Sequence, residues 1–162
     1  MWRIGVTFDD VGGQAALAVV EQRTGEHVVR AVVLSPNDSV MRRLGHFILE
    51  VTRRSGQVAV EVVASDHWAK LRTVPHAVVC KAVTGVGYFS DQVEAGSIRP
   101  GGDLPAMEAG VSNIAPALPA HFGQADLDGA LRTDVSRQAL RLACAIAEPA
   151  VEDQVSTWHL RW

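Results

Sequence analysis

Apolar residues in the first third of the chain either alternate with polar ones or form short runs, which is the pattern of a strand meander. Alternation over 3–8 and an apolar run over 15–20 predict two strands or one long bent strand, and 27–34 predicts another. The connecting turns are rich in Asp and Gly, which tolerate a positive φ: Asp9-Asp10-Val11-Gly12-Gly13 and Thr24-Gly25-Glu26. The opening therefore predicts antiparallel strands joined by tight turns.

The next segment changes to the period of an amphipathic helix. After a break at Ser35-Pro36-Asn37-Asp38-Ser39, apolar side chains recur three and four residues apart: Val40, Leu44, Phe47, Ile48 and Val51. Two arginine pairs occupy the opposite face, and Gly56 ends the helix. The run 57–64 that follows is almost entirely apolar and is interrupted only by Glu61, which predicts a strand buried on both faces of a sheet.

The remaining chain alternates helices with one more buried strand. The pattern predicts a short helix at 68–71, a strand at 77–80, a helix starting at 84 and a Gly- and Pro-rich loop over 96–105. Two prolines shorten any helix within 108–119, and 131–133 is a loop or a brief strand. Thr133-Asp134-Val135-Ser136 caps an apolar helix that continues to Ala147 before Pro149. The tail to Trp162 shows no pattern. We therefore expect an α/β fold, with a mixed sheet and helices on both faces.

Composition favours one globular domain spanning 1–162. Hydrophobic residues make up 48% of the chain and charged residues 20%, which is ordinary for a folded domain. The net charge of −3 provides no global attraction to nucleic acid. Cys80 and Cys144 form neither a disulfide framework nor a zinc motif, so a reducing cytoplasm is the simpler setting. We expect no signal peptide and no membrane span.

Four carboxylates stand at positions where acids are costly or directional. Asp9 and Asp10 leave the first strand, Glu61 interrupts a buried strand, and Asp134 begins the last helix. If they converge at one end of the sheet, they provide the hard oxygen ligands that two Mg²⁺ or Mn²⁺ ions need for phosphodiester hydrolysis. We therefore interpret Asp9 or Asp10, Glu61 and Asp134 as candidate metal ligands and catalytic residues. The choice between Asp9 and Asp10 stays open, because a shift of one residue changes which side chain faces the sheet end.

Each of these residues also has an ordinary structural explanation. Glu61 can form an ion pair with Arg53 or Lys70, Asp134 can cap its helix, and the paired aspartates suit a hairpin turn. Asp66-His67, directly after the buried strand, is either near the site or a solvated loop. The arginine pairs Arg42/Arg43 and Arg53/Arg54 either contact a phosphate backbone or form a solvated helix face. A serine-hydrolase elbow and a P-loop are both missing from the sequence.

Several stretches of the chain resemble the C-terminal nuclease domain of large terminase subunits of tailed phages and prophages. The resemblance covers most of the chain, from about 4 to 147, and the stretches that carry it are Ile4-Gly5-Val6, followed by Asp9-Asp10 and Ala15-Ala16-Leu17-Ala18-Val19; Val58-Ala59-Val60-Glu61; Trp68-Ala69-Lys70-Leu71; Gly87-Tyr88-Phe89-Ser90-Asp91-Gln92-Val93-Glu94-Ala95-Gly96-Ser97-Ile98-Arg99; and Thr133-Asp134-Val135-Ser136. The resemblance implies an RNase H-like fold and a two-metal endonuclease that cuts double-stranded DNA during genome packaging in a bacterial cytoplasm. It implies partners such as a terminase ATPase domain, a small terminase subunit or a portal.

Three positions depart from that family: Thr7, Glu61, which stands where an aspartate is commoner, and Pro100, which stands where a basic residue or histidine is expected. In the preferred register, Thr7 stands where the family has its first-strand aspartate, and a hydroxyl cannot replace a carboxylate that bridges two metal ions. Two hypotheses follow: a metal-dependent DNA endonuclease, or a catalytically degenerate RNase H-like domain that acts as a DNA-packaging scaffold or interaction module. A third, an actin-like or sugar-kinase-like half domain, would need a second lobe and a phosphate loop, for which 162 residues leave no room.

Overall fold

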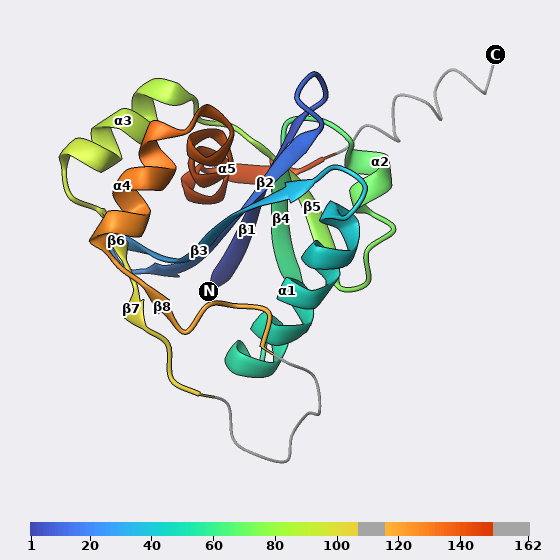
Figure 1. The fold of residues 1–162 in the computed structure, drawn as a ribbon, viewed down its shortest axis with the longest axis horizontal. Helices are drawn as coiled ribbons and strands as arrows, with labels where there is room; N and C mark the ends of the chain where they lie inside the picture. Colours follow the sequence, from blue (N-terminus) through green and yellow to red (C-terminus); the bar gives the residue numbers. More distant parts are fainter. Residues whose placement is uncertain (107–115, 151–162) are drawn as a thin grey trace.

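The computed structural model describes residues 1–106 and 116–150, and a seven-stranded mixed sheet lies at its centre (Figure 1). Its strands are β1 (Trp2–Asp9), β2 (Gln14–Arg23), β3 (Glu26–Pro36), β4 (Val60–Ala64), β5 (Ala77–Ala82), β6 (Ile98–Pro100) and β9 (Ala147–Pro149). They lie in the order β6-β3-β2-β1-β4-β5-β9. β1, β2 and β3 form an antiparallel meander, β1, β4 and β5 are parallel, and β9 is antiparallel to β5. β7 (Gly102–Asp103) and β8 (His121–Phe122) pair separately.

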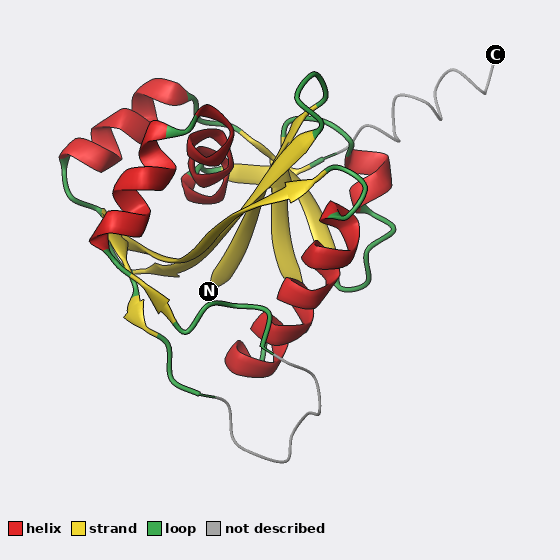
Figure 2. Ribbon diagram, viewed as in Figure 1, coloured by secondary structure: helices red, strands yellow, loops and turns green. Residues whose placement is uncertain are grey.

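Helices cover both faces of this sheet, as Figure 2 shows. α1 (Val40–Ser55) packs on one face and α5 (Asp134–Cys144) on the other, together with α4 (Gln124–Arg132) and α3 (Val86–Glu94). A short helix, α2 (Trp68–Leu71), follows β4. The expected α/β architecture with a mixed sheet is therefore confirmed.

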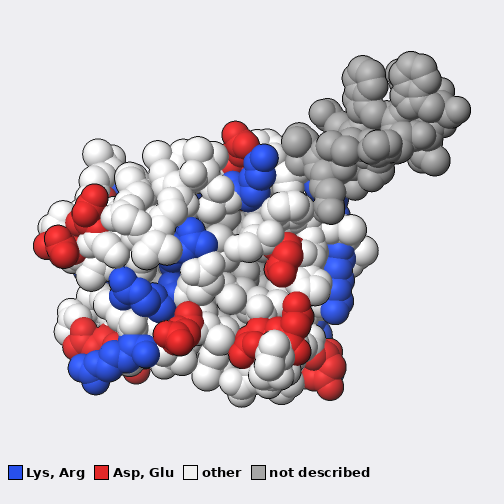
Figure 3. All heavy atoms as spheres, turned by 90° about the horizontal axis from the view of Figure 1, so that it is seen from above, with Lys and Arg blue, Asp and Glu red and all other residues white. Residues whose placement is uncertain are grey.

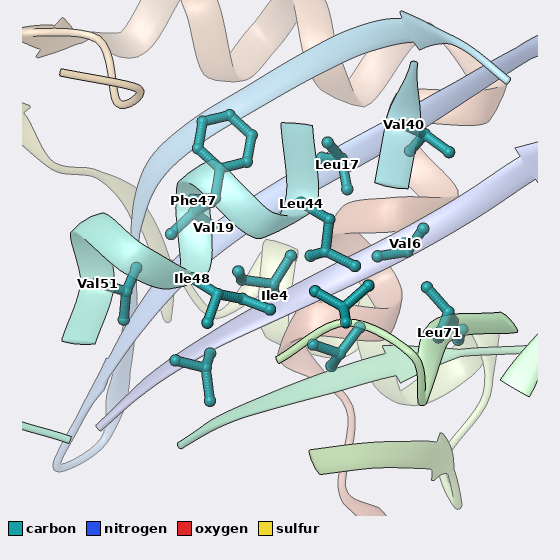
Figure 4. Packing of buried hydrophobic residues seen from close by; sticks show 14 of the residues in the cluster. Ile4, Val6, Leu17, Val19, Val40, Leu44, Phe47, Ile48, Val51 and Leu71 are labelled. Carbon is teal, nitrogen blue, oxygen red and sulfur yellow. The ribbon is translucent and has the colours of Figure 1, made fainter. Parts of the chain in front are cut away.

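The larger core lies between α1 and the sheet (Figure 4). The apolar stripe of α1 faces the side chains of β1 and β2 that point to this side, and Leu71 of α2 closes one end. Labelled in Figure 4 are Ile4, Val6, Leu17, Val19, Val40, Leu44, Phe47, Ile48, Val51 and Leu71. All of them are 1% exposed or less. Burial of such side chains contributes about 1.5–3 kcal/mol each, and this attaches α1 firmly to the meander.

Several expectations from the sequence need correction. Of residues 131–133, which were expected to form a loop or a brief strand, Leu131 and Arg132 end α4, an unexpected helix, and only Thr133 lies between α4 and α5. Gly129 and four polar residues hide the helical period of α4, in which only Leu127 and Ala130 are buried. The last helix ends at Cys144, and the chain enters β9 at Ala147. The predicted loop 96–105 contains the short strands β6 and β7. Most of the ambiguous segment 108–119 and the tail from 151 lie outside the described residues.

Glu50 connects α1 to the segment that contains Ala117 and Leu118. This carboxylate is 6% exposed, and it accepts hydrogen bonds from the backbone amides of Ala117 and Leu118, the latter at 3.1 Å. Arg54, one turn further along α1, donates its Nε to the same carboxylate at 2.9 Å. A buried charge is tolerated only when it is paired and hydrogen-bonded, and Glu50 meets both conditions. The segment around Leu118 is thereby fixed against the core below α1.

Both cysteines are buried and free, and burial raises the pKa of the Cys144 thiol to about 12. The sequence prediction that they form no disulfide is therefore confirmed. Within 1–106 and 116–150, no helix has the length and apolar character needed to cross a membrane.

His27 connects β3 to α3 and gives the fold a pH dependence. Its Nε2 lies 2.9 Å from Nε2 of Gln92, and burial followed by the nearby Arg3 charge lowers the pKa of His27. The unfolded chain therefore binds the proton first, so stability is full above about pH 6.5 and falls as the pH drops below it. We expect the free energy of unfolding to decrease between about pH 7 and pH 5. His27→Gln should flatten this decrease in chemical denaturation, and an unchanged slope would contradict the assignment.

Candidate functional site

The carboxyl ends of β1 and β4 form the edge at which ligands of parallel sheets usually bind. The two strands are parallel neighbours, with Val6 of β1 opposite Ala64 of β4. The residues that follow them therefore meet in space: the turn after Asp9 on one side, and the loop that begins at Ser65 on the other. Figure 3 views the molecule from the side of the β1–β2 turn, where acidic and basic side chains are interspersed rather than gathered in one field.

Asp10, Asp66 and His67 come together at this edge. Each offers one ligand atom, and these atoms all lie within 4.8 Å of one another. Nε2 of His67 lies 3.4 Å from the Asp10 carboxylate and 3.8 Å from that of Asp66. The His67 ring also packs against Phe8, with ring centroids 4.4 Å apart. Two carboxylates and an imidazole fit a single divalent cation, although all three residues are exposed and such groups also occur without a metal.

Local backbone geometry explains how His67 reaches this position. His67 is the N-cap of α2 and has φ 58°, in the left-handed region. Its carbonyl accepts the amide of Leu71 at 3.0 Å, and the indole of Trp68 donates to the Ala64 carbonyl at 2.8 Å. In the sequence, Asp66-His67 is only a possible neighbour of the site. The signal for it was that these residues directly follow a buried parallel strand.

The structure distinguishes Asp9 from Asp10. The Asp9 carboxylate accepts the backbone amide of Gly12 at 2.9 Å, and its carbonyl accepts the amide of Gly13 at 2.9 Å. A Cβ at position 12 would lie 2.3 Å from Oδ2 of Asp9, so a larger residue there would displace this carboxylate from the turn. Asp9 therefore closes the hairpin turn, as the structural alternative proposed, and Asp10 is the aspartate that faces the loop after β4.

Glu61 does not join these residues, and the expected convergence of the four acids is wrong on this point. Glu61 lies opposite Arg3 at the start of β1, six residues before Asp9, which corresponds to about 20 Å along the strand. Its carboxylate pairs with Arg3, at 3.0 Å to Nε and 2.9 Å to Nη2. Arg3, 7% exposed, also donates to the carbonyl of Ala145 just after α5. The apolar run therefore contains Glu61 because a buried guanidinium needs a partner.

Two positions remain: Asp134, a predicted ligand, and Thr7, which stands where the family has its first-strand aspartate. Asp134 is the first residue of α5 and is exposed, where a carboxylate is favoured by the helix dipole. It is not a member of the cluster of Asp10, Asp66 and His67. By strand alternation Thr7 shares the face of Gly5, against which α5 packs. Its Oγ1 is buried and has no hydrogen-bond partner within the described part of the chain.

The fit to a metal therefore differs between the two sets. Asp9, Glu61 and Asp134 do not fit a two-metal centre, because Asp9 serves its turn and Glu61 serves Arg3 at the other end of the sheet. Asp10, Asp66 and His67 fit one cation. No family model, no curated protein and no solved structure matches this chain.

Proposed function

We propose that this chain is an RNase H-like domain of the terminase nuclease type in which the two-metal centre is not preserved. It serves DNA packaging as a scaffold or interaction module in the bacterial cytoplasm. An antiparallel meander followed by parallel β4 and β5, with helices on both faces, supports the fold assignment. The partners that the resemblance implies, double-stranded DNA and a terminase motor, small subunit or portal, belong to the same proposal.

The position of Glu61 carries this proposal. A two-metal nuclease needs carboxylates close enough to share ions about 4 Å apart. Glu61 instead lies at the amino end of β4 and is held by a buried arginine, while the family's first acidic position is Thr7. Moving Glu61 to the other edge would require breaking both the strand register and the pair with Arg3. Glu61, the second acidic ligand that the resemblance implies, therefore has a structural role as the partner of Arg3.

A metal-dependent DNA endonuclease is the second candidate, and the proximity of Asp10, Asp66 and His67 favours it. In this case the three side chains would hold one Mg²⁺ or Mn²⁺, which would supply an activated water for attack on a phosphodiester. Asp66 follows β4 at the carboxyl edge, so it would take the role that the sequence analysis gave to Glu61. This candidate uses a ligand set different from the predicted one.

Nicking of supercoiled plasmid distinguishes the two candidates. The protein is incubated with plasmid in Mn²⁺, Mg²⁺ or EDTA, alongside Asp66→Asn and the matched variant Glu61→Gln. If the domain is catalytically degenerate, neither the wild-type protein nor either variant should nick the plasmid in a metal-dependent manner. Nicking that Asp66→Asn abolishes and Glu61→Gln retains would overturn this proposal in favour of the second candidate. Nicking lost in Glu61→Gln, with the variant still folded by circular dichroism, would restore the predicted site.

A further inference from the structure

The exposed face of α1 carries several basic side chains, with the apolar Leu49 exposed among them. Arg42, Arg43, His46 and Arg53 are all exposed and form what we call the basic stripe. Arg42, His46 and Arg53 are separated by four and seven residues, spacings that place them along one side of a helix. The opposite side of α1 is buried in the core (Figure 4). The stripe is therefore held on a rigid element and faces outward.

The charges of the stripe are not neutralised by the fold. α1 contains a single acid, Glu50, which is buried and paired with Arg54. Within 1–106 and 116–150, no carboxylate forms an ion pair with Arg42, Arg43 or Arg53, and Arg43 donates only to the carbonyl of Leu34. Arg30, by contrast, is paired with Glu21. Three exposed guanidinium groups without a carboxylate partner among the described residues thus lie on α1, although the chain carries a net charge of −3.

The dimensions of the stripe suit a phosphate backbone. Arg42 and Arg53 are eleven residues apart, which corresponds to about 16 Å along a helix. Along the axis of duplex DNA, one strand advances about 3.4 Å per phosphate. A helix lying parallel to that axis would therefore extend over about five phosphates. An anionic membrane fits less well, because interfacial helices insert an apolar face and the apolar face of α1 is already covered by the sheet.

We propose that the basic stripe of α1 binds the phosphate backbone of duplex DNA without reading its sequence. The inference rests on the proposed function only in taking DNA as the partner. The stripe belongs to α1 and shares no residue with Asp10, Asp66 and His67, so binding there is independent of metal and of cleavage. Free guanidinium groups on a helix contact phosphates as charged donors, and each contact formed releases condensed counterions.

Fluorescence anisotropy with a labelled duplex in EDTA tests this proposal, using the full chain at several salt concentrations. The double variant Arg42→Gln/Arg53→Gln removes two charges from the stripe. Lys70→Gln/Arg132→Gln is the matched control, since both residues are exposed, lie on α2 and α4, and alter net charge equally. We expect the stripe variant to bind at least about ten-fold more weakly, with the slope of log K against log salt reduced by about 2.

Three outcomes would overturn the proposal. Equal weakening in both double variants would show a non-specific effect of net charge. Unchanged DNA binding in the stripe variant would place the contact elsewhere, leaving the packaging role intact. Absence of DNA binding by the wild-type protein would remove the stripe's partner and also the DNA-contacting part of the proposed function. Retained helix content by circular dichroism confirms that each variant is folded.

Discussion

Gly5→Ala is expected to destabilise the protein by about 3 kcal/mol, since backbone clashes in a packed core are relieved only by moving whole elements. A Cβ at this position would lie 2.0 Å from the carbonyl oxygen of Ala139 and 2.7 Å from the amide nitrogen of Ala143. Both are backbone atoms of α5, so no side-chain rotation can relieve the contact. The helix would have to lift from β1 and expose the core formed by its apolar face.

Gly129→Ala provides the matched control for this change. Gly129 lies in the interior of α4, is exposed, and has no atom within 4 Å of an added Cβ. Alanine should therefore stabilise the helix there by about 0.5–1 kcal/mol, because it loses less conformational entropy than glycine. Urea denaturation of both variants measures the difference. A Gly5→Ala protein as stable as the wild type would show that α5 does not approach β1 this closely.

Glu50→Ala is expected to cost about 3 kcal/mol, because it leaves buried donors without an acceptor. The lost carboxylate accepts the amides of Ala117 and Leu118 and the side chain of Arg54. Removal would release the segment around Leu118 from α1 and leave the guanidinium without its partner. We expect lower thermal stability and faster amide exchange at Leu118.

Glu50→Gln tests whether charge or shape matters at this position. Glutamine keeps the size of the side chain and one carbonyl oxygen, and because both backbone amides donate to the same oxygen of Glu50, it can still accept both. It cannot pair with Arg54, and we expect a smaller loss of about 1–2 kcal/mol. Equal losses in the alanine and glutamine variants would indicate that the ion pair with Arg54, rather than the amide contacts, accounts for the stabilisation by Glu50.

Much of the fold was predictable, because the sheet and α1 follow strong periodic patterns. The alternation in β1 and the apolar stripe of α1 correspond directly to the core that they build. α4 was missed because its apolar positions are few and Gly129 interrupts them. β6 was missed because a three-residue strand has no period of its own and depends on pairing with β3.

The site was predictable only in part, because strand ends are visible in a sequence but cross-strand partners are not. The sequence placed Asp10 at the end of β1 and Asp66-His67 after β4, and the parallel pairing brings these residues together. Arg53 and Lys70 are the partners of Glu61 that the sequence suggests, whereas the actual partner is Arg3 on the neighbouring strand. An acid in an apolar strand can thus be a metal ligand or the partner of a buried cation, and the register of the strand decides between the two.

Titration of Mn²⁺ by calorimetry tests whether Glu61 belongs to the fold and the two-metal centre is not assembled. We expect at most one bound ion per chain, lost in Asp10→Asn/Asp66→Asn and unaffected by Glu61→Gln. Two bound ions per chain, both lost in a folded Glu61→Gln protein, would contradict it and would identify Glu61 as a metal ligand.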